Sequence, residues 1–113
     1  MGHHPIYSNG SHGDYAAVGS YVAELVRDCE LQAYFAGHDH HQEHITTPAF
    51  EQFVQGAAAK LRRVKTTRYP AESRMTQQFA RSALGFAIVT FTEPSMKARF
   101  FAATAGAVAE LYP

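Results

Sequence analysis

The stretch LQAYFAGHDHH, residues Leu31–His41, joins a short apolar run to a knot of histidines. The run LQAYFA ends at Gly37, and a short apolar run bounded by a turn residue is typical of a buried strand. We therefore expect the histidines that follow, His38, His40 and His41, at the carboxyl end of that strand. In open α/β sheets, ligands bind in the crevice beyond such strand ends.

An amphipathic helix is predicted just before this strand. Apolar side chains recur at helical spacing, which favours a helix over about Tyr15–Cys29. Asp14 is a suitable N-cap residue for it. Cys29 falls on the apolar stripe, so we expect a buried packing residue there. The stripe consists of Val18, Tyr21, Val22, Leu25, Val26 and Cys29.

The rest of the chain is expected to form strands. FEQFVQ, residues 50–55, is predicted to be a strand that ends before Gly56. The runs 84–92 and 96–103 flank the turn EPS, as in a β-hairpin. AVAELY, residues 107–112, is expected to add a last strand, and the polar, basic segment 60–78 is predicted to be a loop. The predicted fold class is α/β, with one helix and a mainly antiparallel set of strands.

Composition narrows the function classes. The chain has 113 residues, enough for one domain, and its 46% hydrophobic content is ordinary for a globular protein. A formal net charge of zero gives no electrostatic case for binding nucleic acid, and no apolar run is long enough to span a membrane. The single cysteine excludes an internal disulfide.

All seven histidines fall in two short segments. Neutral imidazole is the commonest protein ligand of borderline transition metals. In extended backbone, side chains two residues apart point to the same side, so His38 and His40 form a candidate ligand pair. The two segments contain His3, His4 and His12, and His38, His40, His41 and His44.

GHHPIYSNGSHGD (residues 2–14), followed by a helix and then AYFAGHDHH, resembles the C-terminal half of a purple acid phosphatase. The tartrate-resistant type, within the calcineurin-like metallophosphoesterase superfamily, is the most similar. FVQGAAAKLR and SALGFAIVTFTEPSMKARFF resemble its tail, so the likeness covers nearly the whole chain. It implies that residues 1–113 are a single partial domain, the C-terminal half of an αββα sandwich.

The resemblance also implies roles for individual histidines. His3 and His38 match ligands of one metal, and His40 matches a ligand of the other. His12 matches a residue that contacts phosphate and protonates the leaving group. His4 is expected at the pocket mouth. His41 takes the place of an asparagine that touches substrate, although His41 and His44 are also expected to be solvent-facing loop residues.

The implied activity is that of an acid phosphatase. Two metal ions, iron with iron, zinc or manganese, generate a hydroxide that attacks a small phosphomonoester. Members of this family are often secreted or lysosomal, which for this chain is analogy only.

The sequence departs from the family in one major respect. The Asp-x-Gly, Gly-Asp-x-x-Tyr and Gly-Asn-His motifs, which supply the anionic ligands, do not occur in it. Asp39 lies between two ligands and is expected to point away from them. Met1 falls where a strand leading into GHHP is expected. We therefore expect a C-terminal fragment whose partner is the missing N-terminal half of the same domain, with weak or no activity as an isolated chain.

A second class of function stays open, namely a histidine-rich metal-binding protein without catalysis. A nucleotide-binding histidine-triad protein is disfavoured, because that motif places apolar residues between its histidines and Asp39 intervenes here.

Overall fold

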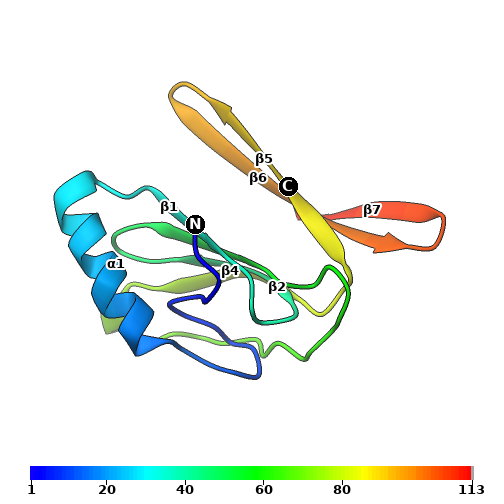
Figure 1. The fold of residues 1–113 in the computed structure, drawn as a ribbon, viewed down its shortest axis with the longest axis horizontal. Coiled ribbons are helices and arrows are strands. Elements are labelled where there is room, and N and C mark those ends of the chain that lie inside the picture. Colours follow the sequence, from blue (N-terminus) through cyan, green and yellow to red (C-terminus); the bar gives the residue numbers. More distant parts are fainter. Residues whose placement is uncertain (113) are drawn as a thin grey trace.

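The structure is a computed structural model and describes residues 1–112. These residues contain one α-helix and seven strands, joined by loops (Figure 1). A short 3-10 turn, Ala71–Ser73, completes the set. The elements are α1 (Ala16–Cys29), β1 (Ala33–Ala36), β2 (Gln42–Thr46), β3 (Glu51–Gln55), β4 (Thr76–Arg81), β5 (Gly85–Thr92), β6 (Ser95–Thr104) and β7 (Ala107–Tyr112).

The strands form two sheets. The first has the order β1-β3-β2-β4, with β1 parallel to β3 and the other pairs antiparallel. The second has the order β5-β6-β7 and is wholly antiparallel. The predicted class, α/β with one helix and mainly antiparallel strands, is confirmed.

Each face of the first sheet has its own apolar core. On one face, Val22 of α1 packs with Ile6 and with Tyr34 and Ala36 of β1. On the other, Phe53 packs with Ala98 and Phe100 of the second sheet. The alternation of side chains along β1 and β3 sends neighbouring residues to opposite faces. The first sheet thus lies between α1 and the second sheet, and the β5-β6 hairpin extends beyond it (Figure 1).

The first residues of the chain lie along β1. Gly2 pairs with Ala36 in a parallel bridge. Gly2 N donates to Phe35 O, and Gly37 N donates to His3 O, both at 3.0 Å. These hydrogen bonds bring the first histidine segment to the carboxyl end of β1, where the second segment begins.

Two strands were not expected. β2, with the sequence QEHIT, falls within and after the second histidine segment. β4 begins at Thr76, near the end of the segment 60–78 that was predicted to be a loop, and continues to Arg81. The apolar pattern does not predict β2, because two of its three buried side chains are polar: Gln42 and Glu43 are fully buried together with Ile45. Such residues are stable inside only when hydrogen bonds satisfy them.

Two expectations about α1 are wrong. Asp14 does not cap the helix: the N-cap residue is Tyr15, with no side-chain cap, and Asp14 Oδ1 accepts from Ser8 N at 2.8 Å instead. Cys29 is exposed rather than buried. Only part of the apolar stripe meets β1, so Val22 is buried whereas Tyr21 is 66% exposed.

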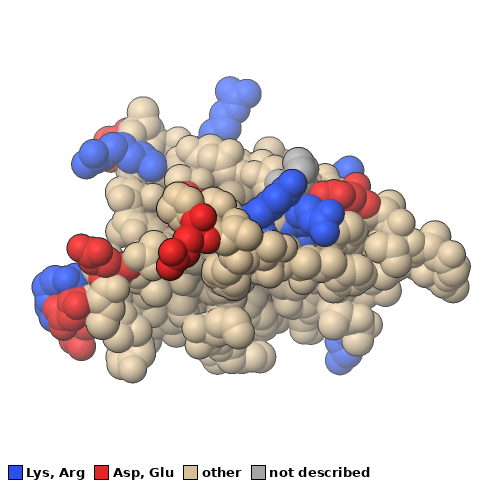
Figure 2. Space-filling view, turned by 90° about the horizontal axis from the view of Figure 1, so that it is seen from above, with Lys and Arg blue, Asp and Glu red and all other residues tan. Residues whose placement is uncertain are grey.

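Charge is scattered over the surface. The face seen in Figure 2 carries Lys and Arg interspersed with Asp and Glu, and most of it is uncharged. This agrees with the net charge of zero. Among the described residues, no helix is both long and apolar enough to cross a bilayer.

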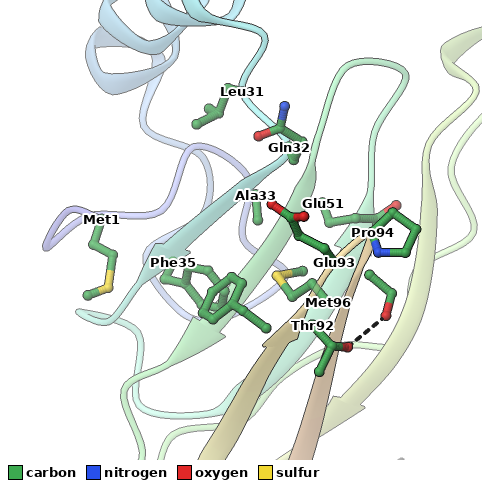
Figure 3. Close-up of a pocket in the computed structure, with 12 residues that line it drawn as sticks. Met1, Leu31, Gln32, Ala33, Phe35, Glu51, Thr92, Glu93, Pro94 and Met96 are labelled. Atoms are coloured by element: carbon green, nitrogen blue, oxygen red, sulfur yellow. Dashed lines mark hydrogen bonds between the residues drawn. The ribbon is translucent and has the colours of Figure 1, made fainter.

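A groove separates β1 from the tip of the β5-β6 hairpin (Figure 3). Met1, Ala33 and Phe35 line one side, and Pro94 and Met96 line the other. No histidine lines this groove, so it is distinct from the two histidine segments.

Phe100→Ala tests the core between the sheets. Phe100 is fully buried, so its truncation leaves a cavity and is expected to lower the free energy of unfolding by about 3–5 kcal/mol. Phe91→Ala is the matched control, because Phe91 is 70% exposed, and its effect is expected to stay within about 0.5 kcal/mol. Urea denaturation of both variants measures the difference, and equal midpoints would contradict the assigned core.

Candidate metal centre

Three imidazoles meet at the end of β1. One ring nitrogen from each of His3, His4 and His38 lies within 4.8 Å of the others. His3 Nε2 and His38 Nδ1 are 3.0 Å apart. The structure therefore brings together His3 and His38, which the resemblance assigns to one metal, and adds His4.

A tight turn sets the position of His38. Its φ is +61°, and Asp39 N donates to Gly37 O at 2.7 Å, which closes a three-residue turn around it. A positive φ is uncommon for a residue with a Cβ, and turns of this kind are rare. The loop is therefore not the extended backbone from which the pairing of His38 with His40 was argued.

Tyr15 is a member of the cluster that sequence reasoning missed. Its hydroxyl lies 2.7 Å from His38 Nε2, so both ring nitrogens of His38 have a partner. Its backbone N donates to Ile6 O at 2.9 Å, which ties the start of α1 to the first histidine segment. The only signal in the sequence was its place at the start of the predicted helix.

The environment of His38 favours the neutral ring. Burial, and then the neighbouring imidazoles of His4, His12 and His3, lower the pKa of His38, whereas the Asp39 carboxylate acts in the opposite direction. Neutral imidazole is the form that binds metal ions.

Asp39 is not part of the three-histidine group and is held by its own hydrogen bonds. It is fully buried, accepts a hydrogen bond from Ser8 Oγ, and lies 2.6 Å from His12 Nδ1. Burial by itself would raise the pKa of Asp39, but the hydrogen bonds from Ser8 and His12 and the nearby His41 outweigh it and lower that pKa. Asp39 thus fixes His12 beside His38, with ring centroids 4.5 Å apart.

Glu43 joins the two histidine segments and is the second group that sequence reasoning missed. Its fully buried carboxylate accepts from Asn9 N and Asn9 Nδ2, from Gln77 Nε2 of β4, and bonds with His41 Nε2 at 2.9 Å. A buried carboxylate is stable when several donors satisfy it in this way. The first loop, the second loop and β4 are therefore held by one side chain.

The expectation that His41 and His44 face solvent is wrong. His41 is fully buried, and its Nε2 lies 2.9 Å from Glu43 Oε2. His44 lies in β2, with Nε2 2.6 Å from a Glu51 carboxylate oxygen and Nδ1 3.2 Å from the Tyr112 hydroxyl. The His41 ring is buried and the His44 ring is half-buried, because β2, which was not predicted, carries His44 and begins next to His41.

His40 stands apart from the three-histidine group. Its Nδ1 is buried and has no hydrogen-bond partner among the described residues. Its carbonyl accepts from Arg62 N at 2.8 Å, and Asn9 O accepts from Lys65 N at 2.9 Å. The segment 60–70, which does run without regular secondary structure, thus holds both histidine loops through its backbone.

Gly10 allows the two loops to lie this close together. A Cβ at this position would stand 2.5 Å from His41 Cε1 and 2.8 Å from Asp39 Cγ. Any larger residue would therefore push the first loop away from the second.

The residues present fit one metal ion better than two. Within the part of the chain that the structure describes, the group contains only neutral imidazoles and no carboxylate. Asp39 and Glu43, the nearest acids in the loop, are occupied by hydrogen bonds. A bridging ligand that fixes a second ion is not among the assembled side chains.

Glu43→Ala tests the bond between the loops. The change leaves the donors of Asn9, His41 and Gln77 without an acceptor, so we expect the free energy of unfolding to fall by about 3 kcal/mol. Glu24→Gln on the exposed side of α1 is the control, with an expected change within about 0.5 kcal/mol. Chemical denaturation compares the two, and similar losses would refute the role of Glu43.

Tyr69 provides a test at high pH. Burial raises the pKa of Tyr69 to about 12, with a smaller contribution from Glu43. In the unfolded chain the pKa of this tyrosine is about 10. The contribution of the buried neutral phenol to the free energy of unfolding is therefore fully present below that pH. It is lost as the pH rises through the higher pKa of the folded state. Denaturation midpoints across this range are expected to fall less in Tyr69→Phe than in the wild type or in Tyr21→Phe. Parallel curves would count against a buried phenol.

No protein-family model and no curated protein sequence matches this chain. Among solved structures, it is similar to a chain described as "GAP50 the anchor in the inner membrane complex of Plasmodium", with a TM-score of 0.73 and 20% sequence identity. The match covers 99% of this chain and 35% of that one, so this chain spans about a third of its length. At this identity the likeness shows a shared fold.

Proposed function

We propose that this chain supplies the histidine side of a metal-dependent phosphomonoester hydrolase, as the resemblance to purple acid phosphatases implies. The observation that supports this most is the approach of His3 Nε2 to His38 Nδ1, 3.0 Å apart although 35 residues separate them in the sequence. In the proposal His40 serves a second ion, consistent with its unpartnered buried Nδ1. The fold proposed is the C-terminal half of a metallophosphoesterase sandwich.

In this proposal His12 handles the proton of the leaving group. When bound, metal ions of this kind neutralise the phosphate charge and supply a hydroxide nucleophile. His12 Nδ1 is engaged by Asp39, which leaves Nε2 as the atom that would protonate the departing oxygen. Its side chain is 32% exposed, so substrate has access to it, and Asp39 fixes the ring orientation.

The proposal also requires ligands from outside the described residues. Three neutral imidazoles cannot offset two metal charges, and no carboxylate joins the group formed by residues 1–112. We infer that the anionic ligands belong to a further polypeptide, the N-terminal half of the same domain, and that the isolated chain has little or no activity. The much greater length of the similar Plasmodium chain leaves room for such a part.

Phosphatase assays and phosphate binding test the proposal together. With Fe²⁺, Zn²⁺ or Mn²⁺ added, the isolated chain is expected to hydrolyse p-nitrophenyl phosphate at or near the background rate. The Zn²⁺-loaded chain is nevertheless expected to bind inorganic phosphate, and His12→Ala to weaken that binding about tenfold. Isothermal titration measures the affinity.

His44→Gln is the matched control, because His44 bonds to Glu51 and Tyr112 away from the cluster. Strong turnover by the isolated chain would contradict the need for further ligands. Failure of the Zn²⁺-loaded chain to bind phosphate would contradict the hydrolase assignment itself.

A further inference from the structure

We propose that His3, His4 and His38 bind a single divalent transition-metal ion on this chain alone, and that Tyr15 is the positioning residue that orients His38. This site requires neither His40 nor catalysis, so it does not depend on the proposed function. It replaces the absent carboxylates with a third imidazole, His4, to which the resemblance gives no ligand role.

The spacing of the rings suits a small tetrahedral ion. Two imidazole nitrogens bound to Zn²⁺ lie about 3.3 Å apart, given Zn–N bonds of about 2.0–2.1 Å. The separation of His3 Nε2 from His38 Nδ1 is 3.0 Å, and the third nitrogen lies within 4.8 Å of both. Small side-chain rotations therefore bring all three onto one ion, with a fourth position left for water.

The chemistry of the donors selects the class of ion. Ca²⁺ and Mg²⁺ prefer oxygen ligands, and none of the three residues offers a carboxylate or carbonyl side chain. Zn²⁺, Co²⁺ and Ni²⁺ accept imidazole readily. The site is therefore expected to take a borderline transition metal and to reject the alkaline-earth ions.

The backbone holds His3 and His4 in place before any ion arrives. His3 O accepts from Gly37 N, and His4 O accepts from the Tyr34 hydroxyl, both at 3.0 Å. The two rings are edge to face, with centroids 4.7 Å apart, and His4 lies 4.3 Å from the His38 ring. Anchoring consecutive residues in this way lowers the entropy lost when they bind.

Tyr15 determines which nitrogen of His38 is free. An ion bound at His38 Nδ1 leaves the proton on Nε2, and that N–H then donates to the Tyr15 hydroxyl, now 2.7 Å away. Metal-ligating histidines commonly donate their second N–H to such a partner, and loss of the partner costs about 10–100-fold in metal affinity. The start of α1 is thereby linked to the metal site.

Titration of the full chain with Zn²⁺, followed by calorimetry, tests the site. We expect one ion per chain, a loss of at least 100-fold in affinity for His38→Ala and His4→Ala, and a loss of about 10-fold or more for Tyr15→Phe. Tyr21→Phe on the exposed side of the same helix, and His40→Ala, are expected to change the affinity less than threefold. Circular dichroism confirms that each variant is folded.

A spectroscopic measurement tests whether Tyr15 orients the His38 ring or only packs against it. In the Zn²⁺-loaded chain, the His38 ring should appear in ¹⁵N NMR as the tautomer protonated at Nε2, with slow proton exchange that becomes fast in Tyr15→Phe. Two ions per chain, with affinity lost in His40→Ala but kept in His4→Ala, would overturn this proposal and favour the two-metal hydrolase. Absence of Zn²⁺ binding in the folded wild type would also overturn it.

Discussion

Two backbone hydrogen bonds at the end of β1 hold the site together. Gly2 N to Phe35 O and Gly37 N to His3 O fix the first residues of the chain against a strand more than 30 residues away. The three-histidine group depends on that contact, because it places His3 and His4 beside the turn that carries His38. The side chains add precision, but the backbone brings the two loops to the same edge of the sheet.

Two buried carboxylates hold the first histidine loop against the second. Asp39 and Glu43 are both fully buried, and each is satisfied by donors from the first histidine loop. A buried carboxylate without hydrogen-bond donors lowers the stability of the fold strongly, so each of these acids favours the arrangement that keeps its donors in place. These two acids thus serve as structural anchors of the loops, and neither belongs to the group formed by His3, His4 and His38.

Most regular elements could be predicted from the sequence, and the reasons for the failures are physical. The helix, the hairpin and the strand before Gly37 carry apolar periodicity that the fold uses directly. β2 lacks it, because the Gln42 amide nitrogen and the Glu43 carboxylate have hydrogen-bond partners distant in the sequence, which no local pattern reveals. The meeting of His3 with His38 was expected from the resemblance, whereas Tyr15 joins them only through the packing of α1. Cys29 shows the converse: it continues the apolar stripe of Val22 and Val26, but it is the last residue of α1 and is exposed.

The left-handed backbone at His38 has a further consequence. Glycine adopts this conformation freely, while a residue with a Cβ gives up about 1 kcal/mol there. Glycine at position 38 would therefore suit this backbone best, but it would remove the imidazole that can bind a metal ion. The imidazole of His38 is thus kept at the cost of backbone strain, and selection for thermal stability alone would favour its replacement by glycine.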